Sequence, residues 1–567
     1  QESRTLATVT LDGEVLGYID RRQLQDRDDD NIGTWLRSLK DKQCAAHLGL
    51  PALPQCLEIC CIPFPGATAD PDALGVYPGL VLFTTPGRLM RPVKSLVTGA
   101  VEHIGTLEQV YLHIACTGKD IVDLPRERDL KLFRHIEISP VATLSFVSSM
   151  IPFFGHNPSP RNLFQCQMAK QTMGIANISS KQRFDNKAYD LRQPQRPLVV
   201  TEQHWGWGMD SHPITTNTIV AIISYAEYDM EDAVVINKSS VERGMFAADV
   251  TKTWTLDLNF DLKKTGTGAT WNPNTASVYR CFRKRTLNAE EKPRAVDNVD
   301  DCGLPKKGAE LKDGTVYFEC CEVHHTLDVD SMAVDEDRDP GLDPVSKLPR
   351  VAPCCKDYVN HKPGRYTKSE RCFVEDVQPI EVTEDGDVLA AVVRVRIIRN
   401  PVIGDKFSSR HGQKGTLSML MPATDMPFSD SGMTPDLMIN PHAFPSRMTV
   451  GMMMELVAGK LAAMTGRFIA HESSAWNAEC TSTNAHELLG EQLARLGFDF
   501  YGEETLYSGQ TGEQLFARIF IGCCAYQRLR HMVMDKWQVR EKTGPVDLTT
   551  LQPLKGRKRG GGIKVGE

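Results

Sequence analysis

The chain has 567 residues, of which 41% are hydrophobic and 24% are charged, and its formal net charge is −7. This composition is ordinary for a folded, soluble protein of roughly three to five structural units. No apolar run approaches the ~18 residues that span a bilayer, and no signal peptide begins at Gln1, so the sequence gives no indication of a membrane or secreted protein.

The first 60 residues predict a β-hairpin followed by a helix. Asp12-Gly13 separates two β-rich segments, and this dipeptide is typical of a tight hairpin turn. Residues 20–39 are expected to form the helix, with Gly33 as a weak point in it.

The middle of the chain predicts strands and a β-rich insertion. Strands are expected over residues 218–224, 233–237 and 388–398, where apolar and β-branched residues are concentrated. Between about 250 and 400 we expect an inserted β-rich unit, which carries a polar, acidic loop near 328–365.

Two helices are predicted near the C-terminal end, over residues 446–465 and 484–496. In the first, apolar residues recur at three- and four-residue steps, and Gly466 supplies a stop. These apolar residues are Val450, Met453, Met454, Val457, Leu461 and Met464. The methionine-bearing stripe is expected to pack in the core rather than to hold a cofactor.

The 16 cysteines predict neither a disulfide framework nor a zinc site. No CxxC motif occurs, and many cysteines are direct neighbours in the sequence. A zinc cluster of Cys320, Cys321, His324, His325 and Cys354 is conceivable, but its spacing matches no standard ligand pattern. We therefore expect reduced thiols and no zinc.

The run GDKFSSRHGQKG at residues 404–415 is the most informative part of the sequence. Lys406, Arg410 and Lys414 follow one another at spacings of four, and His411 lies among them. This spacing would place the three charges on one side of a helix or of an extended segment, although the glycines disfavour a helix. Clustered cations beside glycine backbone favour a polyanionic ligand, most simply phosphates. A solvated basic loop is the alternative.

This run closely resembles the signature of the second-largest subunit of multisubunit RNA polymerases, the counterpart of the bacterial β subunit. Further segments resemble the same family in the same order along the chain. They are NPSPRN at 157–162, YDMED at 228–232, NPHAFPSRMT at 440–449 and GRKRGGG at 556–562. The resemblance covers essentially the whole chain, is weakest at 250–400, and is greatest to the polymerase I type, with polymerases III and II as the alternatives.

The resemblance implies a mixed α+β multidomain fold, in which β-rich external and wall units surround an α/β hybrid-binding core of the double-psi-barrel type. The implied parts are an external region, a fork or connecting region, a first hybrid-binding part, a wall (flap) insertion and a second hybrid-binding part. They fall at residues 1–60, 61–144, 145–250, 251–400 and 401–567. The family's N-terminal lobe and protrusion and its C-terminal zinc-bearing clamp segment have no counterpart here. We therefore expect a fragment or a naturally split subunit.

Four basic residues are implied to take part in catalysis. Arg161 and Arg447 each lie close to prolines, and a planar guanidinium suits a triphosphate because it binds two oxygens at once. The resemblance implies that both contact the phosphates of the incoming nucleotide, and structural salt bridges are the alternative. It also implies that Lys406 and Lys414 lie near the RNA 3′ end and the backbone of the RNA–DNA hybrid.

Glu231 and Asp232 are the candidate metal ligands. They are hard oxygen donors on a turn between two predicted strands, which suits Mg²⁺, although a solvated acidic turn is the alternative. The resemblance implies that they lie near the second, nucleotide-carried Mg²⁺ of a two-metal mechanism. The aspartate triad that holds the primary Mg²⁺ is missing, and the acidic stretches 26–30 and 335–339 resemble it in spacing alone. A partner subunit is therefore expected to hold the primary ion.

Other polar residues are implied to line the path of the hybrid and the template, through contacts that do not depend on sequence. They are Gln165, Lys170, Gln171, Arg410, His411, Arg528, His531, Lys536, Arg540, Arg557, Lys558 and Arg559. Phe164 stands where relatives typically carry tyrosine, which puts any role of that hydroxyl in doubt.

The expected function is that of a DNA-directed RNA polymerase I subunit, forming one side of the active centre in ribosomal RNA synthesis. Its expected partners are the largest polymerase subunit, small assembly subunits, the DNA template, the RNA–DNA hybrid and nucleoside triphosphates. The expected location is the nucleus and nucleolus. A non-catalytic nucleic-acid-binding or assembly module is the alternative from a different class.

Overall fold

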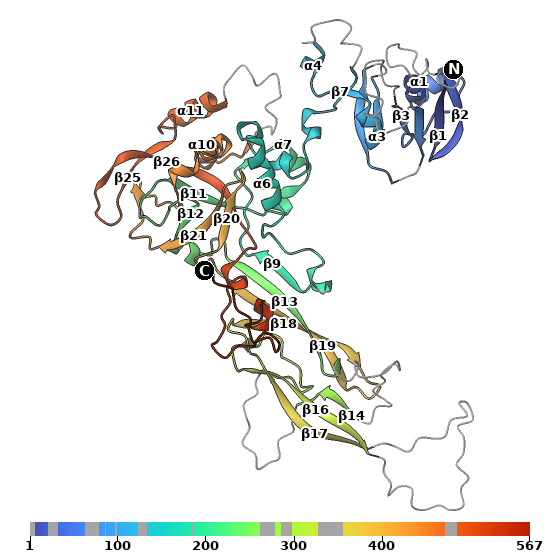
Figure 1. The fold of residues 1–567 in the computed structure, drawn as a ribbon. Coiled ribbons are helices and arrows are strands. Elements are labelled where there is room, and N and C mark those ends of the chain that lie inside the picture. The colour runs from blue at the N-terminus through green and yellow to red at the C-terminus, as the bar shows by residue number, and fades with distance from the viewer. Residues whose placement is uncertain are drawn as a thin grey trace, which may run out of the picture. The chain divides into compact units, whose positions relative to one another are not determined.

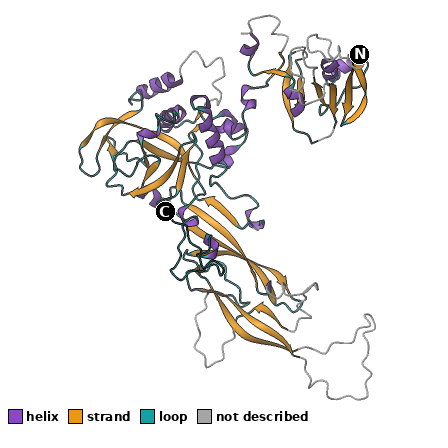
Figure 2. Ribbon diagram, in the orientation of Figure 1, coloured by secondary structure: helices purple, strands orange, loops and turns teal. Residues whose placement is uncertain are grey.

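The structure, a computed structural model, describes residues 6–20, 32–62, 79–84, 87–96, 99–122, 133–183, 185–260, 278–284, 298–326, 355–470 and 485–566. Contacts divide the chain into two compact units, with a boundary after Ser149. The fold is mixed α and β and rich in strands, as predicted (Figure 2). None of the helices in these ranges is long and apolar enough to cross a membrane.

The first unit begins with the hairpin that the sequence predicts. β1 (Leu6–Leu11) and β2 (Glu14–Asp20) pair antiparallel, and Asp12 and Gly13 between them take φ angles of 49° and 95°. A tight hairpin turn needs positive φ at both positions, which glycine and aspartate tolerate best. The sheet has four strands, in the order β2, β1, β4 (Gly79–Phe83) and β3 (Glu58–Ile62).

The helix predicted over residues 20–39 is confirmed in its described part, except at its two end residues. Asp20 ends β2, and helix α1 spans Ile32–Ser38, while residues 21–31 lie outside the described ranges. The boundary expected after residue 60 falls inside β3, because β3 and β4 complete the sheet that the hairpin begins. The unit also contains α2 (Lys42–His47), α3 (Thr106–Val110), α4 (Gly118–Val122) and a sheet of β6 (Val101–Gly105), β5 (Met90–Ser95), β8 (Phe133–Ile136) and β7 (His113–Ala115).

Six strands of the second unit form a closed ring, and most of them are labelled close together in Figure 1. In order around the ring, these strands are β11 (Thr216–Ile222), β23 (Leu437–Ile439), β12 (Ala233–Asn237), β21 (Lys414–Met421), β20 (Lys406–Ser409) and β26 (Gln514–Arg528). The ring closes because β26 also pairs antiparallel with β11. β25 (Glu503–Tyr507) and β22 (Phe428–Ser429) continue the sheet beyond β26. The strand predicted at 233–237 is confirmed, and the one predicted at 218–224 begins and ends two residues earlier.

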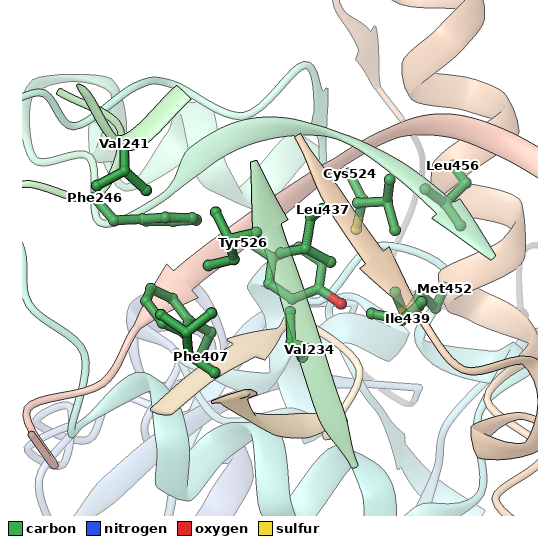
Figure 3. Packing of buried hydrophobic residues seen from close by; sticks show 13 residues of the cluster. Val234, Val241, Phe246, Phe407, Leu437, Ile439, Met452, Leu456, Cys524 and Tyr526 are labelled. Atoms are coloured by element: carbon green, nitrogen blue, oxygen red, sulfur yellow. The ribbon is translucent and has the colours of Figure 1, made fainter. Parts of the chain in front are cut away.

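A buried apolar cluster packs against one face of the strands of this ring (Figure 3). Val234, Phe407, Leu437 and Tyr526 come from four different strands and are each at most 3% exposed. Because successive side chains of a strand point to opposite faces, these four residues lie on the face that carries this cluster. The same packing holds the ends of β12, β20 and β21 in fixed register, and the candidate site lies at these ends.

Helix α10 (Val450–Thr465) packs directly against β26. A Cβ atom at Gly459 would lie 2.0 Å from the carbonyl oxygen of Cys523, so only glycine allows this close approach. The helix begins four residues later than predicted, and Gly466 ends it with φ 67°, as expected. The predicted apolar stripe is partly wrong, because Val450 and Met464 are about half exposed whereas several residues outside the stripe are buried. Those buried residues include Met452, Glu455 and Leu456.

A second, longer sheet contains most of the predicted insertion. Its main path runs through β15 (Glu310–Leu311), β18 (Cys372–Val382), β19 (Val388–Arg399), β14 (Val278–Phe282), β16 (Val316–Thr326) and β17 (Cys355–Arg365). β13 (Ala248–Asp257) pairs with β19 and with β9 (Lys187–Leu191), so the boundary expected after residue 250 falls within a strand. The prediction of an acidic loop near residues 328–365 is wrong for residues 355–365, because these form strand β17. Residues 327–354 lie outside the described ranges.

Further helices and short strands belong to the second unit. They are α6 (Ser159–Ala169), α7 (Glu202–Gly206), α8 (Lys238–Glu242), α11 (Ala485–Arg495), β10 (Val199–Val200) and β24 (Ile469–Ala470). The helix predicted at 484–496 is confirmed as α11, within one residue at each end.

Candidate active centre and nucleic-acid interface

The run GDKFSSRHGQKG folds as a hairpin, neither as a helix nor as one extended segment. Lys406 begins β20 and Lys414 begins β21, and Ser408 lies opposite Lys414 in the register. The turn between the strands enters the interior, where Arg410 is 5% and His411 is 0% exposed. The prediction that Lys406, Arg410 and Lys414 share one side is therefore wrong, because the tip carries Arg410 inward.

Arg410 and His411 both bind the buried carboxylate of Glu455. Arg410 Nη2 donates to one oxygen at 2.6 Å, and His411 Nε2 lies 2.6 Å from the other. Burial alone would raise the pKa of Glu455, but the charge of Arg410 and the hydrogen bond with His411 lower the pKa to about 2. Neither Arg410 nor His411 presents a surface to a nucleic acid, which corrects both predictions.

Arg528 and Gln165 are also interior. The guanidinium of Arg528 pairs with Asp405 at 2.9 Å, and both side chains are 0% exposed. Arg528 also donates to the carbonyl oxygens of Phe246 and Arg399, both at 2.6 Å. Gln165 is 3% exposed and donates to Gln527. Both residues were predicted to contact nucleic acid. This prediction is wrong because both side chains are buried, like those of Arg410 and His411.

Glu231 and Asp232 lie on the loop that precedes β12, beside Arg447. Arg447 donates to Asp232, and this pair is partly open to solvent, with 20% and 44% of the two side chains exposed. Glu231 is exposed and has φ 52°, a left-handed conformation that is uncommon for this residue type. A hollow of about 440 Å³ adjoins the pair. It is lined by Met230, Glu231, Asp232, Asn440, His442, Ala443, Ser446 and Arg447.

Arg161 and Lys414 reach the same place from two other elements. Arg161 on α6 donates to the carbonyl oxygen of Gly412 at 3.3 Å. Burial lowers the pKa of Arg161, and the nearby charge of Arg447 lowers it further, while Asp232 opposes this. Lys414 lines a narrow hollow together with Asp232 and Arg447. The structure thus brings together three of the four residues predicted as catalytic.

Phe164 packs beside two of these cations. Its ring centroid lies 5.6 Å from the guanidinium carbon of Arg161 and 5.9 Å from Lys414 Nζ. Both distances are within the range of a cation–π contact. The ring is 46% exposed, so it can still meet a ligand although it lacks a hydroxyl.

Lys406, the fourth predicted catalytic residue, belongs to a second basic cluster. His531 Nε2 lies 2.8 Å from Gln171 Oε1. Burial lowers the pKa of His531, and the charges of Lys536, Lys406 and Arg530 lower it further. The cluster therefore contains predicted residues from three segments of the chain, and Arg530, which the sequence reasoning missed. Lys170 is exposed at the C-terminal end of α6.

The basic residues nearest the C-terminal end lie beside a large hollow. Arg557 donates to the carbonyl oxygens of Met534 and Asp535, and Arg540 donates to that of Gly544 at 2.9 Å. Arg557, Lys558 and Arg559 are exposed. The hollow, of about 870 Å³, is lined in part by Lys252, Trp254, Lys368, Trp537, Arg557 and Lys558. Sequence reasoning missed its aromatic residues, because they come from distant segments.

No cluster of three or more histidine, cysteine or acidic side chains suited to a metal ion occurs within the described ranges. Cys321 faces Cys281 across two strands, with 3.5 Å between the sulfurs, and its neighbour Cys320 donates to the carbonyl oxygen of Lys362. Cys354, the most distant member of the zinc cluster weighed above, lies outside these ranges. The candidate metal ligands Glu231 and Asp232 are two carboxylates that line the hollow of about 440 Å³ beside Arg447.

Comparison with known proteins identifies the family. The profile of RNA polymerase Rpb2, domain 6, matches residues 147–559, and the chain therefore belongs to the Rpb2 family of RNA polymerase subunits. Within that family it is similar to the DNA-directed RNA polymerase I subunit RPA2 of Homo sapiens, with 39% identity over 99% of this chain and 43% of the relative.

Two other relatives give the same result. The RNA polymerase I subunit rpa2 of Dictyostelium discoideum is 40% identical over 99% of this chain and 44% of its own length. The subunit RPA135 of Saccharomyces cerevisiae is 38% identical over 99% of this chain and 41% of its own length. The resemblance to the polymerase I type is confirmed, and the chain spans about two fifths of the length of these relatives.

Proposed function

We propose that the chain forms one side of the active centre of a DNA-directed RNA polymerase I and takes part in template-directed nucleotidyl transfer in ribosomal RNA synthesis. The observation that carries this proposal is the pair of hollows at Asp232, one lined by Lys414 and both by Arg447. Arg161, from a third element, lies close enough to interact with Arg447 and Asp232. Cations around an open, polar hollow suit a triphosphate better than they suit a neutral ligand.

In this function, the two arginines bind and neutralise the triphosphate. Arg447 and Arg161 would hold its oxygens in place, so that the charge that develops on the leaving phosphates meets cations already in position. Lys414, on the same rim, would bind near the RNA 3′ end. The ion pair between Arg447 and Asp232 orients the guanidinium before the nucleotide arrives.

Glu231 and Asp232 fit a shared Mg²⁺ rather than a site that binds the ion alone. Mg²⁺ is held by one or two carboxylates together with substrate phosphates and water, and these two side chains offer that number. When bound, the ion would stabilise negative charge on the phosphate oxygens. The primary Mg²⁺ would be held by the largest subunit of the complex.

The second basic cluster and the C-terminal basic residues would follow the nucleic-acid backbone. Lys406, Gln171, His531 and Lys536 form one patch, and Lys170, Arg540 and Arg557 to Arg559 extend the basic surface. We assign the closed six-stranded ring to the hybrid-binding core, as a barrel of the double-psi type, with residues 145–250 and 401–567 forming it. Residues 251–400 would form the wall, and residues 1–60 and 61–144 the external and fork regions.

The proposed partners are the largest polymerase subunit, small assembly subunits, template DNA and the RNA–DNA hybrid, in the nucleus and nucleolus. The similarity to the named polymerase I subunits supports this choice over polymerases III and II.

Purification of the native complex through a tag on this chain tests the proposal. We expect a largest subunit with the aspartate triad to co-migrate, and the complex to synthesise RNA on a DNA template. Accessory subunits identified in the same sample distinguish polymerase I from polymerase III. A complex without that largest subunit and without RNA synthesis would favour the non-catalytic module.

Replacing Lys406 with glutamine in this complex should weaken the salt dependence of binding to an RNA–DNA hybrid. Each lost phosphate contact lowers the slope of log affinity against log salt concentration by about one. The control is Lys238→Gln, because Lys238 is exposed and pairs with Glu242 on the surface of α8. An unchanged slope for the Lys406 variant would contradict the proposed backbone contact.

A further inference from the structure

Glu455 is a buried acidic side chain near the proposed active centre. It lies on α10 and is 1% exposed. Besides Arg410 and His411, it accepts a hydrogen bond from the backbone nitrogen of Ala525 on β26 at 3.0 Å. A buried carboxylate is stable only when it is paired and hydrogen-bonded, and both oxygens of Glu455 meet this condition.

The hairpin tip that Glu455 holds is linked to the segment that carries Arg161. His411 Nδ1 lies 2.9 Å from Asn157 Nδ2, and Asn157 Oδ1 accepts from the backbone nitrogen of Gly451 at the start of α10. A Cβ atom at Gly412 would lie 2.3 Å from the carbonyl oxygen of Arg161. The tip and the first turn of α6 are therefore in direct backbone contact.

The same tip is linked to the loop that carries Arg447. Gln413 Nε2 donates to Thr449 Oγ1, and also to the carbonyl oxygen of Ala443 at 3.4 Å. Thr449 and Ala443 lie on either side of Arg447 in the sequence. Lys414 follows Gln413 directly, so its backbone position depends on the same contacts.

We propose that Glu455 is a positioning residue, which fixes the hairpin tip at residues 410–413 and thereby sets Arg161, Lys414 and Arg447 in their mutual arrangement. Glu455 lines neither hollow at Asp232, so its effect on the three cations is transmitted through the tip. The inference rests on the proposed function, because it assigns these three cations to the incoming nucleotide.

The chemistry of the network explains why a neutral amide cannot replace Glu455. The carboxylate accepts from three donors and neutralises Arg410, whereas glutamine brings an N–H₂ group that faces donors. A displacement of about 1 Å at a reacting group can lower the rate about 100-fold. Loss of the carboxylate should therefore affect nucleotide addition beyond its effect on stability.

The test compares Glu455→Gln with Lys460→Met in the complex purified from cells. Lys460 lies on the same helix and is 5% exposed. Its ammonium pairs with Glu504 and donates to the carbonyl oxygens of Gly502 and Ile521, which all lie outside the hairpin tip. We expect Glu455→Gln to lower the maximal rate of nucleotide addition about 10- to 100-fold and to raise the apparent KM for the nucleotide several-fold. The two variants are compared under conditions in which both complexes lose activity on heating at the same rate. Lys460→Met should then change neither the maximal rate nor the apparent KM by more than about twofold.

Asn157→Ala provides a second variant, in case the Glu455 variant fails to assemble. It removes the link from His411 to α10 without leaving a buried charge. We expect the same direction of change in rate and KM, at about 3- to 10-fold. Equal kinetics for the Glu455 and Lys460 variants, or wild-type kinetics for Asn157→Ala, would overturn the positioning role. Failure of the proposed function is distinguishable, because the unaltered complex would then add no nucleotide at all.

Discussion

Replacing Arg447 with alanine in the assembled complex is expected to lower the rate of nucleotide addition about 100- to 1,000-fold, which is the usual effect of removing one preorganised donor to a developing charge. Assembly of the subunits should be almost unaffected. Arg447 lies on a surface turn, its side chain is 20% exposed, and it pairs with Asp232 beside an open hollow. Its removal therefore leaves no buried group without a partner.

The Arg447→Lys variant distinguishes the effect of the positive charge from the effect of the planar guanidinium group. Arg447→Lys keeps a positive charge but loses the planar fork that binds two oxygens, so its rate should lie between those of the wild type and the alanine variant. The matched control is Arg192→Ala, because Arg192 pairs with Asp249 at 2.7 Å on the surface and lies outside the hollow. The measurement is single-nucleotide extension at limiting nucleotide concentration, with subunit composition checked in each sample. An Arg447→Ala complex that extends RNA at the wild-type rate would refute the assignment.

Local signals in the sequence predicted several elements closely. Asp12-Gly13 specified a turn, and the apolar run at 233–237 specified a strand with its observed bounds. Both depend on preferences within a few residues, where backbone conformation and side-chain pattern agree. The loop position of Glu231 and Asp232 followed from the same reasoning, since it lies before a correctly predicted strand.

Burial of the cations could not be predicted in the same way. The spacing of Lys406, Arg410 and Lys414 gave no indication that the chain turns between them, because the turn depends on a counter-charge 45 residues beyond Arg410. One signal was available, since Glu455 interrupts the apolar sequence between Met454 and Leu456. An acid within an apolar helix face indicates a buried cationic partner.

The assembly of the hollow was also beyond local reasoning. Asp232 and Arg447 are 215 residues apart, and only the parallel and antiparallel pairing of β12 with β21 and β23 brings them together. The family resemblance predicted that Asp232 and Arg447 both act on the incoming nucleotide. Their mutual contact, and the separation of Lys406 from them, came from the topology of the six-stranded ring.

Replacing Asp405 with alanine is expected to cause the largest loss of stability, about 3–5 kcal/mol in the free energy of unfolding, because it leaves the charge of Arg528 buried without its partner. Burial lowers the pKa of Arg528 to about 10, and Asp405 opposes this effect. Asp405 also accepts hydrogen bonds from the backbone nitrogens of Val402 and Val533. The carboxylate thus joins the start of β20 to the segment that follows β26.

A double variant shows whether the unpaired charge or the lost packing dominates. Asp405→Ala combined with Arg528→Met removes both charges, so it should be less destabilised than Asp405→Ala alone. The exposed pair of Lys238 and Glu242 is the control, because removing one partner there should cost less than about 1 kcal/mol. The midpoint of denaturant unfolding of each purified protein gives these differences. If the double variant is no more stable than Asp405→Ala, the backbone hydrogen bonds of Asp405, rather than the charge pair, hold this corner of the ring together.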